Sequence, residues 1–390
     1  MTYWLDIIGA GERVLPPIPP AQTVLGPNRL KSRVPHLVEW ASPTLDAMLA
    51  QIVALRGTPT VVLASGDPMW FGIGATLARH LPPSEYRLNP APSSFQFAAA
   101  RLHWPLQHLA TISLHGRAVE TIHPHILPGH RILALTSDRT TISAVAALLV
   151  ARGYGQSLMT VLENLDGAEE RISTATAATL DTTAIGDFHV LAVDCVADVG
   201  AELLPPVAGL PDDAFISDGQ LTKREVRAAT IAKLAPFPGA LLWDVGAGCG
   251  SVAIEWMRAA RDAKAIAFEH AATRLDMIAA NTKALGTPGL QIVGGEAPAS
   301  LAAQPAPDAV FLGGDVGNAA LFDTCWSAIK PGGRLVANAV TLDGEAALYD
   351  RHAALGGELA RIEVSVLDTI GDQRVMRPRM AVTQWLVIKP

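Results

Sequence analysis

Short apolar runs rich in β-branched residues alternate with Ala- and Leu-rich stretches along almost the whole chain. In the second half the alternation is regular, and we predict strands there at 240–246, 264–270, 290–296, 307–314 and 333–340, with helices between them. Strands that alternate with helices are typical of parallel sheets covered by helices. The sequence therefore predicts an α/β fold, Rossmann-like in its second half.

The first half follows the same pattern less regularly. The predicted strands lie at 3–9, 58–65, 131–137, 157–164 and 188–196, and the predicted helices at 72–81 and 141–153. Near the C-terminus, apolar runs at 358–370 and 381–390 have no helical stretch between them, as an antiparallel pair of strands requires.

With 390 residues the chain is too long for one ordinary core, and two domains of about 200 residues are expected. The stretch 200–213 contains three prolines and interrupts all periodicity, which favours a linker. We predict a first domain over 1–200, a linker over 201–211 and a second domain over 212–390.

Composition argues against several classes of protein. The net charge is −7 and no Lys/Arg cluster is present, so a nucleic-acid partner is not expected. No apolar run reaches the roughly 18 residues that span a bilayer, and the N-terminus lacks the pattern of a signal peptide. The three cysteines are far apart and favour neither disulfides nor a zinc site. We expect a cytoplasmic enzyme without a metal, and three histidines in 123–130 do not change this.

A glycine-rich turn follows the first strand of the second domain. Gly246, Gly248 and Gly250 alternate after Asp244 and directly precede a helical pattern. Dinucleotide sites need G-x-G-x-x-G, whereas G-x-G-x-G after an acidic residue is typical of S-adenosylmethionine sites. The carboxylate is expected near the methionine amino group. The predicted loop residues are Asp244, Gly246, Ala247, Gly248, Cys249 and Gly250.

A second carboxylate supports this interpretation. Glu269 ends the next strand, 19 residues after Gly250, where it can accept the ribose hydroxyls of an adenosine. Glu296 and Ala297 follow the third strand and are predicted to lie against the adenine. The segment 311–318 lacks the Pro-Pro-aromatic motif of many amine methyltransferases, which favours a carbon nucleophile. The second domain is predicted to be a methyltransferase.

The first half resembles the tetrapyrrole (precorrin) methylases. The stretch 61–81, with its Ser-Gly-Asp-Pro turn, is similar to the signature loop of that family, and 91–106 is similar to the next segment. The resemblance implies two α/β subdomains with S-adenosylmethionine in the cleft between them. It implies cofactor contacts at Gly9, Gly11, Gly66, Asp67, Pro68, Ser93 and Ser94.

The second half resembles the decarboxylating methyltransferase domain of the cobalamin pathway, through 209–228, 335–346 and 382–387. Both modules in this order imply two S-adenosylmethionine sites and methylation of two meso carbons, C5 and C15, of a tetrapyrrole. They also imply loss of carbon dioxide from an acetate side chain. Related domains associate, so a homo-oligomer is expected. Thr222 is placed at the cofactor by the resemblance.

The first domain departs from its family in the stretch 7–26, where four prolines replace expected helical residues. A second hypothesis therefore makes the first domain a tetrapyrrole-binding scaffold, with only the second domain catalytic. A third hypothesis is a methyltransferase that acts on RNA or protein. The net negative charge and the resemblance of the first half to tetrapyrrole methylases disfavour it.

Cationic groups are needed to hold the carboxylates of a tetrapyrrole. A helix is predicted at 221–235, with Thr222 capping its start. Substrate-binding candidates are Lys223, Arg224 and Arg227 on this helix, and Asp315 and Asn338 after the fourth and fifth strands. No catalytic residue is identified from the sequence.

Overall fold

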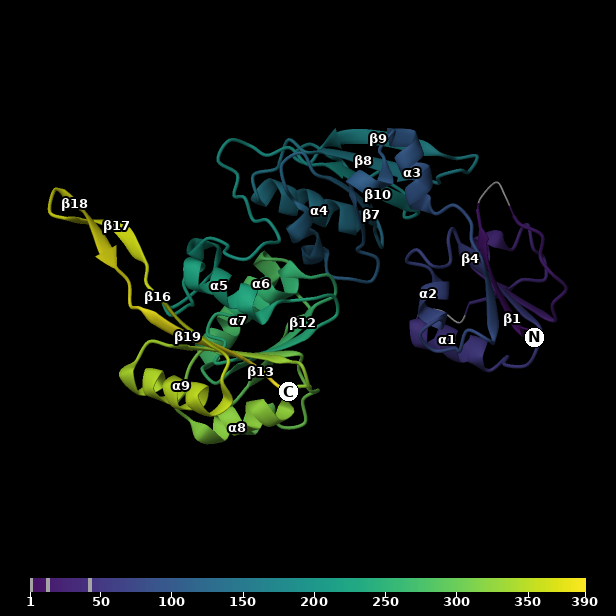
Figure 1. The fold of residues 1–390 in the computed structure, drawn as a ribbon. Helices are drawn as coiled ribbons and strands as arrows, with labels where there is room; N and C mark the ends of the chain where they lie inside the picture. Colours follow the sequence, from purple (N-terminus) through teal and green to yellow (C-terminus); the bar gives the residue numbers. More distant parts are fainter. Residues whose placement is uncertain (1–2, 12–14, 41–43) are drawn as a thin grey trace. The chain divides into compact units, whose positions relative to one another are not determined.

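The computed structural model describes residues 3–11, 15–40 and 44–390. Its contacts divide the chain into two compact units, drawn in Figure 1. The first unit comprises Met1–Val119 and Pro128–Glu202, and the second comprises Glu120–Leu127 and Leu203–Pro390. The predicted α/β fold class is confirmed in both.

A five-stranded parallel sheet begins the first unit. Its strand order is β3 (Val38–Glu39), β2 (Thr23–Gly26), β4 (Thr60–Ser65), β1 (Leu5–Ala10) and β5 (Tyr86–Asn89). Alternate strand residues enter two cores: Ile8 and Val61 pack on one face, while Ile7 and Val62 pack on the other with α1 (Leu45–Val53) and α2 (Ile73–Leu77). Residues 15–22, in the proline-rich stretch, form no helix.

A second, mixed sheet completes the first unit. Its order is β6 (Ala110–Ser113), β7 (Arg131–Leu135), β10 (His189–Asp194), β8 (Leu158–Glu163) and β9 (Arg171–Thr176), and only β6 and β7 are parallel neighbours. Helix α3 (Ser94–Leu102) packs Phe95 and Ala98 against this sheet. The other elements here are α4 (Arg139–Ala151) and the short 3-10 helix Leu106–His108, whereas nearly all of the 3-10 helix Val119–His125 belongs to the second unit.

The second unit contains a seven-stranded sheet. Its order is β13 (Gln291–Gly294), β12 (Lys264–Glu269), β11 (Leu241–Val245), β14 (Ala309–Leu312), β15 (Arg334–Ala339), β19 (Val382–Ile388) and β16 (Glu358–Ile362). The first five strands are parallel, and β19 runs antiparallel to both of its neighbours. All five predicted strands of the second half are present.

Helices cover both faces of this sheet. One core contains side chains from α5 (Arg224–Leu234), α6 (Ser251–Ala259) and α7 (Ala272–Ala284). The opposite core contains side chains from α8 (Ala319–Ala328) and α9 (Leu342–Leu355). Because the parallel strands all end at one edge, the loops that follow them meet there, which is where ligands bind in open α/β sheets.

The C-terminal strands differ from the sequence prediction in one respect. The predicted antiparallel pair exists as β16 and β19. However, the run 358–370 is two strands, because β17 (Ser365–Ile370) leaves the main sheet and pairs with β18 (Gln373–Pro378) in a separate ribbon. This ribbon projects from the seven-stranded sheet as the yellow hairpin of Figure 1.

The helix start predicted at Thr222 is wrong in its details. Helix α5 begins at Arg224, its N-cap residue is Lys223, and no side chain caps it. The backbone carbonyl of Thr222 instead accepts a hydrogen bond from Arg227 Nη1 at 2.6 Å. A buried guanidinium thus supports the segment that leads into the helix.

The Pro-rich segment before α5 is packed against the second unit. Leu204 and Leu210 are 3% and 1% exposed and belong to the core beneath α5 and α6. The backbone N–H groups of Gly209 and Leu210 donate to Glu255 at 2.7 and 2.9 Å. The stretch predicted as a linker therefore contributes apolar side chains and hydrogen bonds to the unit that follows it.

Replacing Leu210 with Ala should destabilise the second unit by about 2–5 kcal/mol, because the change leaves a cavity in a core that cannot fully collapse. Hydrogen exchange of the β11 and β12 amides reports the opening free energy of this unit. Val207→Ala is the matched control, since Val207 lies in the same segment and is 60% exposed. Equal exchange in both variants would show that the segment is only a tether.

Candidate cofactor and substrate sites

The glycine loop after β11 has the geometry that its sequence predicts. Gly246, Gly248 and Gly250 adopt φ values of 72°, 59° and 80°, in the left-handed region that only glycine enters without strain. Gly250 is the N-cap of α6. A Cβ on Gly250 would lie 3.1 Å from Ile278 Cγ2, so the loop also packs too closely for a side chain there.

Asp244 lies at the end of β11 and is 1% exposed. Its Oδ2 accepts a hydrogen bond from the Ala253 N–H at 2.9 Å. Its Oδ1 is also buried and has no hydrogen-bond partner among the described residues. Burial raises the pKa of Asp244 from 3.8 to about 7, and the nearby charge of Glu269 adds to this, while the Ala253 hydrogen bond opposes it.

Glu269 ends β12, beside Asp244 on the neighbouring strand, and is 3% exposed. Its Oε2 accepts from the Gly248 N–H at 2.9 Å. Its Oε1 accepts from the backbone N–H groups of His270 and Ala271 at 2.9 and 3.1 Å. Three of the roughly four acceptor positions of this carboxylate are therefore occupied by backbone groups.

The loop after β13 lies next to Glu269. The Gly295 N–H donates to the Glu269 carbonyl at 3.2 Å. Glu296 is exposed and Ala297 is half-buried. The structure thus brings the predicted residues of three neighbouring strand ends, Asp244, Glu269 and Glu296, to one edge of the sheet. Half-buried Ala247 and buried Cys249 complete the glycine loop between them.

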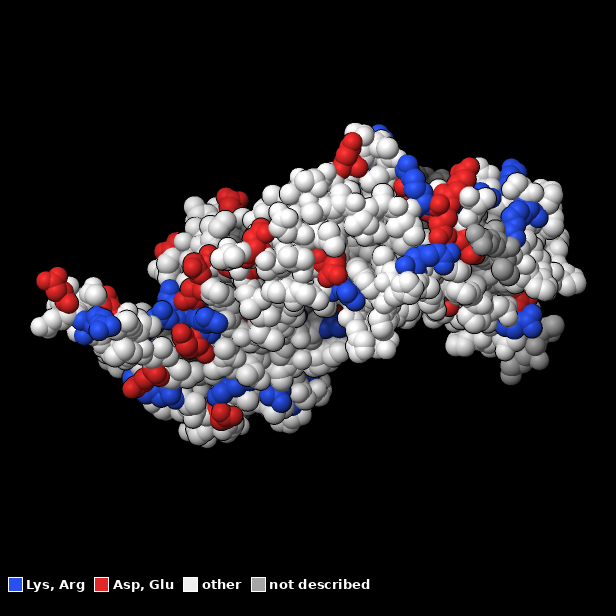
Figure 2. Space-filling view, turned by 90° about the horizontal axis from the view of Figure 1, so that it is seen from above, with Lys and Arg blue, Asp and Glu red and all other residues white. Residues whose placement is uncertain are grey.

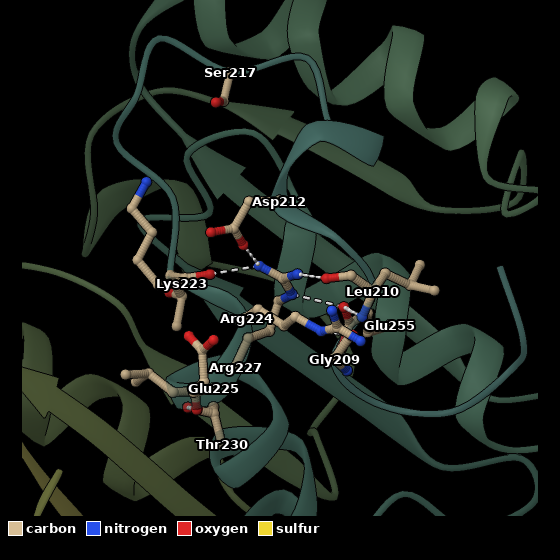
Figure 3. Close-up of polar contacts among 12 residues, drawn as sticks. Gly209, Leu210, Asp212, Ser217, Lys223, Arg224, Glu225, Arg227, Thr230 and Glu255 are labelled. Atoms are coloured by element: carbon tan, nitrogen blue, oxygen red, sulfur yellow. Dashed lines mark hydrogen bonds and ion pairs between the residues drawn. The ribbon is translucent and has the colours of Figure 1, made fainter. Parts of the chain in front are cut away.

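Arg227 does not face a ligand. Its side chain is 0% exposed, and its Nε donates to Glu255 Oε1 at 2.6 Å (Figure 3). Its other N–H groups donate to Asp212 Oδ1 at 3.1 Å and to the carbonyls of Thr222 and Leu210. Four of the five N–H groups thus donate within the protein and the side chain is buried, which contradicts its prediction as a substrate-binding residue.

Lys223 and Arg224 lie at the start of α5 and are accessible. Figure 3 shows Lys223 extending away from the buried ion pair. Its Nζ donates to the Gly219 carbonyl at 3.2 Å, and Arg224 Nε donates to the Gly209 carbonyl at 2.8 Å. Both contacts are to neutral backbone oxygens. The positive charges of Lys223 and Arg224 have no carboxylate partner among the ion pairs of the described residues.

Asp315 and Asn338 differ in how far their side chains are free to contact a substrate. Asp315 is exposed, has φ 51°, and its Oδ2 accepts from Asn318 Nδ2 at 2.9 Å. Asn338 lies one residue beyond Ala337, which is in register with Leu312 of β14. Its Nδ2 donates to buried Thr230 Oγ1 at 3.1 Å and its Oδ1 accepts from Gln384 at 2.9 Å, so much of its amide already points into the protein.

In the first unit, the structure brings Gly9, Gly66 and Ser93 together. A Cβ on Gly9 would lie 2.6 Å from the Gly66 carbonyl and from Ala91 Cβ, and one on Gly66 would lie 3.2 Å from Ser93 Cα. Ser93 forms a capping box with Gln96 at the start of α3, directly before Ser94. Gly11 lies just beyond β1 and Pro68 in the turn after β4. Asp67 Oδ1 accepts from the Met69 N–H at 2.7 Å.

Sequence reasoning missed Asn281 and Arg274 of α7. Asn281 is 0% exposed and bonds to both the Ile216 backbone and the Cys249 carbonyl. Arg274 donates to Asp218 and Gln220. The signal was present: Asn281 lies three residues after buried Ile278 and seven after Arg274, which places all three on one face of the helix.

The surface carries mixed charge. Figure 2 shows acidic and basic side chains interspersed among broad uncharged areas on the face displayed. Within the described ranges, no group of three or more His, Cys, Asp or Glu side chains could hold a metal ion. No helix in the part of the chain that the structure describes combines the length and apolar character needed to cross a membrane.

Two family models match the chain, one in each half. Residues 8–181 match the tetrapyrrole (corrin/porphyrin) methylases, and residues 213–389 match the precorrin methyltransferase domain. Together with the two α/β units and the glycine loop at the strand ends, these matches define a methyltransferase of two modules.

The whole chain has close relatives with the same organisation. It is 46% identical over 395 residues to the precorrin-6Y C(5,15)-methyltransferase [decarboxylating] of Sinorhizobium sp, covering 98% of this chain and 95% of the relative. It is 38% identical to the protein of that name from Mycobacterium tuberculosis, covering 90% and 87%. The chain therefore belongs to the precorrin-6Y C(5,15)-methyltransferase (decarboxylating) family, which confirms the resemblance predicted from the sequence.

A solved structure matches the second half. The C-terminal domain of precorrin-6Y C5,15-methyltransferase from Rhodobacter capsulatus is 43% identical and has a TM-score of 0.46. The match covers 48% of this chain and 100% of that domain.

The raised pKa of Asp244 predicts a pH-dependent stability. Because the folded state holds this proton more tightly than the unfolded state, the stabilisation is fully present below about pH 4, is lost as pH rises toward 7, and is constant above. The loss is about 4 kcal/mol for a pKa raised from 3.8 to about 7. Asp244→Asn should therefore gain stability relative to the native chain across this window, as measured by hydrogen exchange of β11 amides.

Asp262→Asn is the control for this titration. Asp262 belongs to the same unit, and its side chain is 80% exposed, so water solvates the carboxylate when the protein is folded. The difference in stability between this variant and the native chain should therefore change little over the same pH range. If the stability difference between Asp244→Asn and the native chain were equally independent of pH, the carboxyl group of Asp244 would be ionised in the folded protein at all these pH values.

Proposed function

We propose that this chain uses S-adenosylmethionine to methylate C5 and C15 of precorrin-6Y and to decarboxylate an acetate side chain, giving precorrin-8 in cobalamin synthesis. The observation that carries the proposal is the full-length match to decarboxylating C(5,15)-methyltransferases, with both modules in the same order. The geometry of the glycine loop supports it independently of that match.

The second unit fits the proposed cofactor at three points. Three left-handed glycines turn the loop, and at exposed Gly246 and half-buried Gly248 the main chain is open to a ligand with no side chain in the way. The orphaned Oδ1 of Asp244 offers a buried acceptor for the methionine ammonium group. Glu269 lies at the next strand end, where the ribose is expected. Further proposed contacts come from Thr222, Ala247, Cys249, Glu296 and Ala297.

Glu269 adds a constraint on how the ribose binds. With three backbone N–H groups on its carboxylate, about one acceptor position remains for two hydroxyls. The His270 and Ala271 N–H groups occupy Oε1, so the free position is on Oε2 and accepts one hydroxyl. A second hydroxyl on Oε2 requires the Gly248 N–H to turn away from that oxygen. Since Gly248 has no side chain and a positive φ, it can make this peptide movement at low cost.

The first unit is proposed to hold the other cofactor site, at Gly9, Gly11, Gly66, Asp67, Pro68, Ser93 and Ser94. The missing side chains of Gly9 and Gly66 let the ends of β1 and β4 approach the segment that contains Ala91 and Ser93, which gathers backbone groups there. This is the arrangement that lets a ligand lie directly against the main chain.

Lys223 and Arg224 are the proposed contacts for substrate carboxylates. They are accessible, lie at the start of α5, and bond only to backbone carbonyls, so a carboxylate can replace a weak partner with a strong one. Asp315 and the remaining polar capacity of Asn338 lie at the same edge of the sheet and are proposed to contact substrate as well. Arg227 is left out of this set because it is buried.

When bound, S-adenosylmethionine supplies a methyl group from its sulfonium to a carbon nucleophile. The tetrapyrrole carbon provides the electron pair and later loses its proton. The acetate carboxylate leaves as carbon dioxide, its electron pair enters the conjugated ring, and the methylene carbon takes up a proton. The protein's contribution to both steps is alignment, worth up to about 7–11 kcal/mol in favourable cases, and the neutralisation of peripheral carboxylates.

The scaffold hypothesis differs from this proposal in product stoichiometry. We expect two methyl groups and one carbon dioxide per molecule of precorrin-6Y turned over by the native chain, measured by mass spectrometry of the product. In Gly9→Ala, the new Cβ would lie 2.6 Å from the Gly66 carbonyl, so the first site should be distorted. Its product should carry one methyl group fewer and still lack the carboxyl group.

Gly155→Ala is the control for this variant. Gly155 belongs to the first unit, and a Cβ there would lie 3.7 Å from Ala178 Cβ, which is ordinary contact. Its product should equal that of the native chain. A native chain that adds only one methyl group would support the scaffold hypothesis, and an unchanged Gly9→Ala product would remove these residues from the first site.

Replacing Lys223 and Arg224 together with Ala should raise the KM for precorrin-6Y about tenfold or more, because two charged contacts to carboxylates are lost. The KM for S-adenosylmethionine should change far less. Arg261→Ala with Lys264→Ala is the matched control. It removes the same charge, but Lys264 begins β12 and so lies at the opposite end of the sheet. Unchanged substrate kinetics in the Lys223/Arg224 variant would contradict the assignment.

A further inference from the structure

The segment Ile216–Gln220, which we call the strap, crosses the glycine loop immediately before α5. A Cβ placed on Gly248 would lie 3.4 Å from the Gln220 carbonyl, so the end of the strap comes close to the middle of the loop. The strap leads through Leu221 and Thr222 directly to Lys223. It thus connects the proposed cofactor loop to the proposed substrate-binding cations.

Asn281 joins the strap to the glycine loop through side-chain hydrogen bonds. Its Oδ1 accepts from the Ile216 N–H at 2.8 Å. Its Nδ2 donates to the Ile216 carbonyl and to the Cys249 carbonyl, both at 2.9 Å. Both amide hydrogens are used, the side chain is 0% exposed, and Ile216 and Cys249, which it joins, are 33 residues apart in the sequence.

Arg274 makes a second side-chain attachment to the strap. Its Nε donates to Asp218 Oδ2 at 2.8 Å and its Nη2 donates to Gln220 Oε1 at 2.7 Å. Asp218 Oδ1 also accepts from the Gln220 N–H at 3.0 Å, which closes the turn. Arg274 and Asn281 are seven residues apart on α7 and therefore lie on the same face of that helix.

Building on the proposed function, we propose that Asn281 is a positioning residue of the cofactor site in the second unit, and that Arg274 assists it. Together they hold the strap over the glycine loop, so that the strap forms one wall of the site. Neither needs to touch the ligand. A carboxylate at position 281 could not donate to the carbonyls of Ile216 and Cys249, so the wall would lose its inner attachment although the volume is conserved.

The test uses S-adenosylhomocysteine, which binds without being turned over, and the full chain. Titration calorimetry gives the affinity, and hydrogen exchange of peptides over 213–222 and 244–252 identifies the site in the second unit. Asn281→Asp should weaken binding at this site about tenfold or more, and ligand protection of the strap peptide should fall with it. Arg274→Met should weaken binding several-fold.

Thr282→Val separates positioning from general destabilisation. Thr282 is 5% exposed, neighbours Asn281 on α7, and its Oγ1 donates only to the Ala279 carbonyl of the same helix, at 2.8 Å. It should bind the ligand within about twofold of the native chain even where its Tm falls as far as that of Asn281→Asp. If Asn281→Asp does not fold, Arg274→Met decides, because its loss exposes Asp218 to water and leaves no buried charge.

Native-like affinity in both Asn281→Asp and Arg274→Met would overturn the inference. So would a Thr282→Val variant that loses as much affinity as Asn281→Asp, since the effect would then follow the stability of α7. If the ligand protects neither of the two peptides in the native chain, the proposed function of this unit is rejected instead. The two failures are therefore distinguishable.

Discussion

A buried ion pair between Arg227 and Glu255 determines how the second unit is assembled around its strand ends. The two side chains are 0% and 1% exposed and lie 2.6 Å apart. A buried pair is stabilising only where its remaining hydrogen-bonding groups are satisfied. Here Glu255 accepts the N–H groups of Gly209 and Leu210, and Arg227 reaches the Thr222 carbonyl. The pair therefore fixes the path of the chain on both sides of the strap.

The candidate cofactor site of the second unit is formed by the edge of the sheet together with the helices on one of its faces. Val245 is in register with Phe268 on one neighbouring strand and with Leu312 on the other, so the turns that follow them begin at the same level. This places Asp244 beside the strand that ends in Glu269. Helices α5, α6 and α7 then bring in the strap, the ion pair and Asn281. Strand register positions the carboxylates of Asp244 and Glu269, and helix packing positions the strap.

Local patterns predicted the elements and the loop, and tertiary packing decided which side chains face the site. The spacing of Gly246, Gly248 and Gly250 is a local property, so it could be read from the sequence. The burial of Arg227 could have been inferred only from its place four residues before buried Ile231, on the inner face of α5. Its partner Glu255 is 28 residues away, and no local pattern indicates that pairing. The buried face of α7 likewise indicates that Asn281 is buried, but its partners are 65 and 32 residues away and no local pattern indicates them.

The two candidate sites use different physics for the same proposed ligand. In the first unit, Gly9, Gly66 and Ser93 bring backbone groups close together, and the residues proposed there include no buried carboxylate. In the second unit, Asp244 is buried with one oxygen unpaired, and its pKa lies near neutrality. A cation that binds beside Asp244 favours its ionised form, so binding releases a proton wherever that group is protonated beforehand. The proposed function thus makes ligand affinity rise with pH up to about 7 in the second unit, through a buried carboxyl group of a kind that the residues proposed for the first site do not include.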